Sequence, residues 1–330
     1  SSMRGRLLRK AVNVDGRNAR AVAALAEHMG ATDWGRPTAE ELWDELRPLS
    51  PMHTGMSWAR IEEADESAAV DPHFERAAVD APPAELPETM ADPFERNFPI
   101  ALDSGASVFS FTFGLLPDDA VQALKARGIF IMGTATSPAD AVALERSGVD
   151  AVVAQGAEAG GHRGIFDGAS GDPLIGTMAL VPQVVDAVSV PVVASGGIMD
   201  GRGVRAALDL GAVAAQMGTA FIACPESQAD AAYRAALFSD VAHDTVMTRA
   251  LSGRPARCLR NAFVDWGEGV ANAPPDYPIA YDAGKALHQA AKVHGETGFG
   301  AQWAGQGAPL ARSMPVAELI ATIAAEMDAA

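Results

Sequence analysis

The chain has 330 residues, of which 48% are apolar and 20% charged, so it can bury a core and is not disordered as a whole. Asp and Glu number 42 against 25 Lys and Arg, and the net charge of −17 argues against binding to nucleic acid or to an anionic membrane surface. We find neither an apolar run near the ~20 residues of a membrane span nor a secretory signal, and therefore expect a cytoplasmic protein. The two cysteines predict neither a disulfide scaffold nor a metal site.

The first hundred residues carry few regular patterns. Apolar spacing predicts helices over 19–29 and 38–46, and Thr38 with Glu41 forms a capping box at the start of the second. Residues 62–97 are acidic and proline-rich, which is typical of a loop or linker. Weak strand candidates lie at 7–8, 11–14 and 98–102.

A regular alternation of strands and helices begins near residue 107. Short apolar strands are predicted over 107–113, 129–132, 150–154, 191–194 and 212–217. Helices are predicted between them over 118–127, 138–147, 181–188 and 203–210. The alternation indicates an α/β fold with a parallel sheet, and its even spacing favours a barrel over a doubly wound sheet, although periodicity alone does not decide between them. A closed TIM-type (β/α)8 barrel needs eight strands, so the predicted barrel is incomplete.

The last hundred residues are predicted to be mostly helical, with amphipathic segments at 229–239, 282–294 and 315–327. Residues 261–278 are rich in proline and glycine and are expected to form an ordered surface excursion.

Glycines follow two neighbouring strands of the predicted sheet. Ser195, Gly196 and Gly197 follow the fourth strand, and Gly218 with Thr219 follows the fifth. In a parallel barrel these turns lie side by side, and their backbone N–H groups can bind a phosphate. The alternative is that they are ordinary turn glycines.

A long glycine-rich loop over 157–176 follows the third strand and contains His162. A histidine flanked by glycines can approach a bound ligand and suits general-base chemistry. The alternative is a surface histidine, which is how we interpret the other six. Hydroxyl groups in the run Thr134 to Thr136 could line a pocket or cap the next helix.

Several of these segments together resemble the nitronate monooxygenase family, formerly called 2-nitropropane dioxygenase. The resemblance covers about residues 73–330 and is carried by segments 134–137, 153–164, 180–188, 191–203, 216–221, 254–257, 259–261 and 303–307. The segment Ala159 to Gly164 separates this family from its relative, the FMN-dependent enoyl-ACP reductase, which usually lacks an arginine after the histidine. Residues 73–330 are thus predicted to be an FMN-binding barrel region with a C-terminal helical excursion.

The resemblance implies an enzyme that uses FMN and O2 to oxidise alkyl nitronates to a carbonyl compound and nitrite. It implies that His162 is the general base for neutral nitroalkanes and that Gly161 contacts the substrate. Ser195, Gly196, Gly197, Gly218 and Thr219 would hold the FMN phosphate. Gln155, Gln216 and Met217 would flank the flavin, and Gly160 would also bind the cofactor.

The N-terminal segment 1–72 departs from this family. It lacks the Pro-Met-Ala-Gly-like turn, the glycine-rich second strand and the cofactor-contacting asparagine of the family's first three βα units. Residues 23–63 instead resemble a fragment of a molybdopterin oxidoreductase of the formate dehydrogenase kind, without its cofactor-binding parts. We therefore expect the first three βα units to be missing or replaced, with weakened FMN binding and activity.

Two other functions stay open. One is an FMN-dependent enoyl reductase, and the other is an inactive remnant that binds flavin or phosphate. The expected partners are a nitronate or nitroalkane and O2, while the oligomeric state is left open.

Overall fold

The computed structural model describes residues 93–166, 171–269, 277, 279–293 and 295–329. The helices predicted over 19–29 and 38–46, the strand candidates at 7–8 and 11–14, and the segment 1–72 lie outside the described residues.

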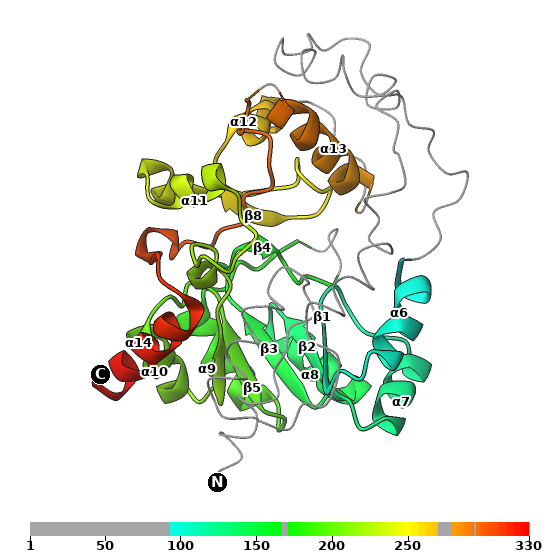
Figure 1. Cartoon of the computed structure of the whole chain (residues 1–330). Helices are drawn as coiled ribbons and strands as arrows, with labels where there is room; N and C mark the ends of the chain where they lie inside the picture. The colour runs from blue at the N-terminus through cyan, green and yellow to red at the C-terminus, as the bar shows by residue number, and fades with distance from the viewer. Residues whose placement is uncertain (1–92, 167–170, 270–276, 278, 294, 330) are drawn as a thin grey trace.

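A five-stranded parallel sheet forms the centre of the described structure (Figure 1). Its strands are β1 (Val108–Phe111), β2 (Phe130–Ala135), β3 (Ala151–Gln155), β5 (Val192–Ser195) and β6 (Ala214–Gln216), in the order β1-β2-β3-β5-β6. All five predicted strands are confirmed. Among the described residues β1 and β6 are the edges of this sheet, so these strands form an open part of a barrel wall.

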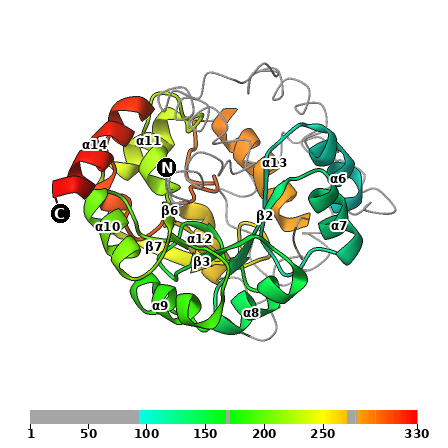
Figure 2. The same cartoon turned by 90° about the horizontal axis from the view of Figure 1, so that it is seen from below.

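The helices between the strands are also confirmed. They are α7 (Asp118–Ala126), α8 (Pro138–Ser147), α9 (Thr177–Ala187) and α10 (Gly201–Asp209), and they surround the outside of the strands (Figure 2). Helix α8 has a capped start, because the Ser137 side chain accepts a hydrogen bond from the N–H of Asp140. Helix α9 begins four residues before its predicted start, where the Thr177 N–H donates to the carboxylate of Glu158.

The strand candidate at 98–102 is wrong, because these residues lie in helix α6 (Pro93–Asp103). Phe94, Phe98 and Leu102 are spaced four apart and pack against the core from one face of this helix. The rings of Phe94 and Phe98 stack with centroids 4.9 Å apart, and Phe98 meets Phe109 of β1 edge to face at 6.0 Å. Helical spacing over eight residues therefore outweighs the short apolar run.

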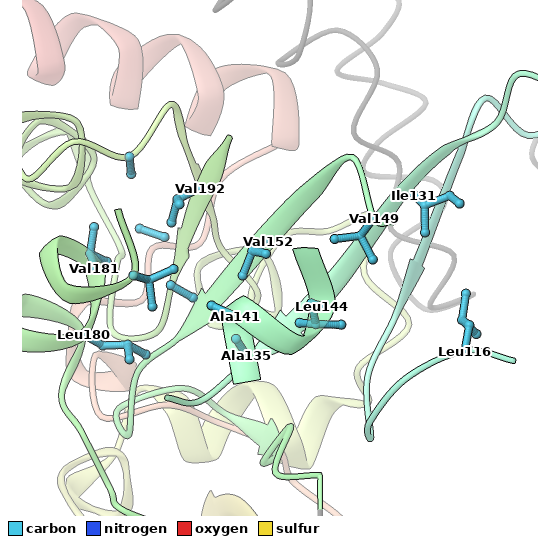
Figure 3. Packing of buried hydrophobic residues seen from close by; sticks show 14 of the residues in the cluster. Leu116, Ile131, Ala135, Ala141, Leu144, Val149, Val152, Leu180, Val181 and Val192 are labelled. Atoms are coloured by element: carbon cyan, nitrogen blue, oxygen red, sulfur yellow. The ribbon is translucent and has the colours of Figure 1, made fainter. Parts of the chain in front are cut away.

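Alternating side chains of the sheet divide the core into two layers. Ile131, Val152 and Val192 belong to the larger cluster with the helices, which includes Leu144 and Val181 (Figure 3). The opposite face carries a smaller cluster: Val108, Met132, Ala151, Val153, Val193 and Ala214. Both faces are apolar, as expected for a parallel sheet that is covered on both sides.

A second, antiparallel sheet lies at one end of the first (Figure 1). It contains β4 (Gly161–His162), β8 (Ala256–Leu259) and β7 (Thr245–Thr248), in the order β4-β8-β7. The expectation of a mostly helical C-terminal region missed β7 and β8, two strands of four residues each that pair locally. Strand β4 has two residues, and its partner residues in β8 lie about a hundred positions further along the chain.

Helices complete this end of the chain: α11 (Ala231–Leu237), α12 (Ala262–Gly269), α13 (Ile279–Val293) and α14 (Val316–Ala329). Three of them match the predicted amphipathic segments. Helix α12 corrects the expected surface excursion, because Phe263 and Val264 are buried in a cluster with Leu251 and Leu287. No helix in the described ranges is both long enough and apolar enough to cross a membrane.

We predict that Leu144→Ala lowers the free energy of unfolding by about 2–5 kcal/mol, because the side chain is fully buried (0% exposed) between α8 and the sheet. Leu115→Ala is the control, because Leu115 is 49% exposed and its truncation is expected to change stability by no more than about 0.5 kcal/mol. Urea unfolding followed by circular dichroism measures both. Equal losses in the two variants would contradict this packing.

Candidate functional site

The register of the parallel sheet brings three of the predicted site segments together. Gln155 at the end of β3 pairs with Ser195 at the end of β5, which pairs with Gln216 at the end of β6. Adjacent strands lie about 4.8 Å apart, so the turns that follow them start side by side. The segments 155–160, 195–197 and 216–219 therefore lie together at the carboxyl end of the sheet.

The two glycine turns at this end of the sheet have backbone N–H groups without a hydrogen-bond partner among the described residues. Gly196 and Gly197 have φ values of 118° and 70°, in the left-handed region that favours glycine. The structure shows no hydrogen bond to another described residue from the N–H groups of Gly196, Gly197, Gly218 or Thr219. A Cβ atom built on Gly218 would meet nothing within 4 Å. N–H groups without a partner among the described residues, together with the open space at Gly218, suit a phosphate or another anion.

The side chains of Glu158 and Thr177 hold the turn at Gly196 in place. Thr177 Oγ1 lies 2.8 Å from Glu158 Oε2 and 3.0 Å from the carbonyl oxygen of Gly196. A Cβ atom on Gly196 would lie 2.9 Å from Thr177 Oγ1, closer than real Cβ contacts. The turn is therefore held in place by a side-chain network that also requires glycine.

The segment 303–307 crosses the loops that follow β3, β5 and β6. The N–H of Gln306 donates to the carbonyl of Glu158 at 2.9 Å, and the N–H of Gly305 donates to Thr219 Oγ1 at 3.0 Å. A Cβ atom on Gly160 would lie 2.5 Å from the backbone nitrogen of Gly305. Gly160 thus has a packing role in this structure, and its contact with a cofactor stays a prediction.

His162 lies on β4, where it pairs with Ala256 of β8. Its Nε2 atom lies 2.8 Å from Ser252 Oγ. The neighbouring Gly161 has a φ of 78°, and a Cβ atom on it would meet nothing within 4 Å. Open space thus lies beside the Cα of Gly161, the residue before His162, and the backbone of His162 is fixed by the antiparallel pairing.

Four aromatic rings surround the His162 imidazole, and we call them the aromatic cage. Their centroids lie 5.2–5.6 Å from the imidazole centroid, and they belong to Phe113, Tyr277, Tyr281 and Trp303. Such rings limit the access of water to the imidazole. The members of the cage come from distant segments, so the sequence did not predict it. Tyr281 lies in the first turn of α13, whereas Tyr277 lies in a turn before that helix begins at Ile279, so helical spacing gives no signal for the pair.

Phe113 has a strained backbone. Its φ of 74° is rare for a residue with a bulky side chain, and such conformations cost of order 1–3 kcal/mol and cluster at functional sites. The Phe113 ring contacts the guanidinium of Arg254, whose Cζ lies 4.1 Å from the ring centroid. The turn after β1 is therefore held in a shape that keeps this ring against His162.

The side chain of Arg163 holds the segment that carries His162 in place. Its side chain is fully buried (0% exposed) and pairs with Asp172 through Nε at 2.7 Å and Nη2 at 3.1 Å. Its Nη1 donates to the carbonyls of Gln155 and Gly156, both at 2.9 Å. Burial raises the pKa of Asp172, but hydrogen bonds from Arg163 and the Leu174 N–H, with the charge of Arg163, outweigh it and leave the pKa below its usual range.

The side-chain amide of Gln155 also binds the backbone of this loop. Its Nε2 donates to the carbonyl of His162 at 3.0 Å, and its Oε1 accepts from the N–H of Gly164 at 2.8 Å. Whether Gln155, Gln216 and Met217 flank a flavin stays a prediction. Thr136 Oγ1 donates to the Asp140 carboxylate at 3.0 Å, whereas the N-cap of α8 is Ser137, so neither of the two alternatives for this hydroxyl is confirmed.

Solved structures resemble this fold at moderate sequence identity. A nitroalkane oxidase from Streptomyces ansochromogenes matches with a TM-score of 0.69 and 40% identity, over 73% of this chain and 70% of that chain. FabK from Thermotoga maritima matches with a TM-score of 0.61 and 33% identity, over 73% and 74%. The predicted α/β class is thus confirmed.

Curated relatives share more of the sequence. A nitronate monooxygenase from Paraburkholderia phytofirmans is 48% identical over 261 residues, which are 78% of this chain and 70% of the relative. One from Pseudomonas aeruginosa is 54% identical over 230 residues, which are 69% of this chain and 66% of the relative. The chain thus spans about two thirds of the length of these relatives.

The resemblance of residues 23–63 to a molybdopterin oxidoreductase is not supported. Residues 59–326 match the family model described as nitronate monooxygenase. The matched range overlaps the end of segment 23–63 and includes all the described site residues. By this match and by the identity to curated relatives, the chain belongs to the nitronate monooxygenase family.

Proposed function

We propose that the chain is an FMN-dependent oxidoreductase that oxidises alkyl nitronates with O2 to a carbonyl compound and nitrite. The observation that carries this proposal is the position of His162, whose imidazole lies in the aromatic cage directly after Gly161, a residue with open space at its Cα. The relatives of this chain from Paraburkholderia phytofirmans and Pseudomonas aeruginosa are named nitronate monooxygenases, and these names support the same reaction.

The glycine turns suit the phosphate of FMN. Unpaired N–H groups at Gly196, Gly197, Gly218 and Thr219 fit its oxygens, and the space at Gly218 leaves room for them. When bound, FMN would supply the electron-transfer and oxygen chemistry. In this proposal Ser195 joins the phosphate site, while Gln155, Gly160, Gln216 and Met217 lie around the flavin.

His162 would act as general base when the substrate is a neutral nitroalkane. A histidine titrates near neutral pH, so it can accept the α-proton under ordinary conditions. The aromatic cage would keep water from the substrate carbon, and Gly161 would let the substrate approach closely. A nitronate has already lost this proton, so its oxidation would not need the base.

An FMN-dependent enoyl reductase is the second candidate, favoured by the match to FabK at 33% identity. The curated nitronate monooxygenases, at 48% and 54% identity, favour the first. Nitrite release from propionate 3-nitronate under air, against NADH oxidation with a crotonyl thioester, separates the two. The weakened FMN binding expected from segment 1–72 stays a prediction, because that segment lies outside the described residues. The cytoplasmic location also stays a prediction.

We predict that Gly218→Val strongly weakens FMN binding without loss of stability. The Cβ of the valine would enter open space with nothing within 4 Å, and the side chain would block a phosphate there. Gly269→Val is the control, because it also enters open space but lies at the end of α12. Flavin absorbance after gel filtration and the melting temperature measure the two effects. Unchanged flavin content in Gly218→Val would contradict the phosphate site.

We predict that His162→Asn slows the turnover of a neutral nitroalkane by on the order of 10²–10⁴ and affects the corresponding nitronate far less. The reason is that only the nitroalkane must lose a proton. Nitrite release from both substrates, with the flavin content of the variant measured in parallel, tests this. Equal losses on the two substrates would mean that His162 binds or positions the substrate and does not remove the proton.

A further inference from the structure

We propose that Ser252 is a positioning residue that places the imidazole proton of His162 on Nε2, so that Nδ1 is the basic nitrogen. This inference rests on the proposed role of His162 as general base. It concerns a residue outside the segments that predicted the site, in the turn between β7 and β8.

The hydrogen bonds of Ser252 determine the position of the proton. Its Oγ lies 2.8 Å from His162 Nε2 and 3.1 Å from the carbonyl oxygen of Arg254. A carbonyl oxygen can only accept, and a hydroxyl has one proton to donate. If the hydroxyl donated to His162, no proton would lie between Ser252 Oγ and the carbonyl oxygen of Arg254. Two oxygen acceptors would then face each other at Ser252, which is fully buried (0% exposed). The hydroxyl therefore donates to Arg254 and accepts from His162 Nε2–H.

Backbone hydrogen bonds hold both partners of this contact. The N–H groups of Ser252 and Gly253 both donate to the carbonyl of Arg249, which closes a tight turn in front of β8. The N–H of Arg163 donates to the carbonyl of Pro255 at 2.9 Å, directly after His162. The serine and the histidine thus lie on two adjacent segments that are locked in register.

This arrangement has a consequence for proton transfer. A neutral imidazole carries one N–H and one lone pair, so with Nε2 committed to Ser252 the lone pair lies on Nδ1. When Nδ1 accepts a proton, the Nε2–H···Oγ contact remains and becomes charge-assisted. The ring therefore does not need to turn during the reaction. Ser252 would also stabilise the imidazolium.

The decisive experiment combines spectroscopy and kinetics on the FMN-loaded chain. Nitrogen-15 NMR of the histidine rings, with the signals of His162 assigned from their loss in His162→Asn, reports which nitrogen carries the proton. In the unsubstituted chain we expect a protonated Nε2 and an unprotonated Nδ1. A proton on Nδ1 would overturn the proposal without any variant at Ser252.

The kinetic part uses Ser252→Ala with Ser147→Ala as the matched control, because Ser147 Oγ also donates to a main-chain carbonyl, that of Leu144 at 2.8 Å. Removal of a residue that orients a reactive histidine typically costs about 10–100-fold. We expect a loss of that size on a neutral nitroalkane, little change on the nitronate, and a shift of the acid limb of the pH profile to lower pH.

If Ser252→Ala behaves like Ser147→Ala and its His162 signals are unchanged, Ser252 has no positioning role. If His162→Asn affects both substrates equally, the general-base function fails instead, and the NMR measurement still decides the proton position. The two failures are therefore distinguishable.

Discussion

The guanidinium of Arg163 has no contact with solvent, and a charge in that setting must be paired and hydrogen-bonded by the chain itself. Asp172 supplies the opposite charge and accepts from Nε and Nη2, and the carbonyls of Gln155 and Gly156 accept from Nη1. These contacts join the end of β3 to the loop on which His162 lies. Removing one partner of such a buried pair typically costs about 3–5 kcal/mol, so the loop has little freedom to take another shape.

The position of His162 follows from this constraint. Gln155, held by Arg163, binds the backbone on both sides of Arg163 through its amide. The pairing of β4 with β8 then presents the imidazole to Ser252, and the aromatic cage closes around it. The buried charge of Arg163 thus connects the parallel sheet to the antiparallel one, and Arg257 of β8 adds a second link through its hydrogen bond to the carbonyl of Ala157.

The local parts of this structure could be predicted from the sequence. Buried strands that end in glycine, and helices with capping residues, carry their signal within a few residues, so β1, β2 and the helix α8 were predicted correctly. The same local signals pointed to His162 and Gly218. Phe98 was misread because a short apolar run was considered without its helical partners Phe94 and Leu102.

The remote contacts could not be predicted in this way. Strand β4 has two residues and no periodicity, and its partner β8 lies far along the chain. Phe113, Ser252 and Trp303 surround His162 only after the chain has folded, and no pattern in the sequence indicates that they meet. The family resemblance identified several of these segments, but it did not assign them a role at the imidazole.

The segment 303–307 sets an order of assembly for this site. The turns after β5 and β6 are made from neighbouring strands, yet Gly305 reaches Thr219 across a separation of 86 residues. A contact between such distant residues closes a large loop, so it forms late and carries a high entropic cost. During synthesis the glycine turns emerge well before the segment that covers them. The site would therefore reach its final shape only when the last tenth of the chain has joined it, which couples ligand binding to the completion of folding.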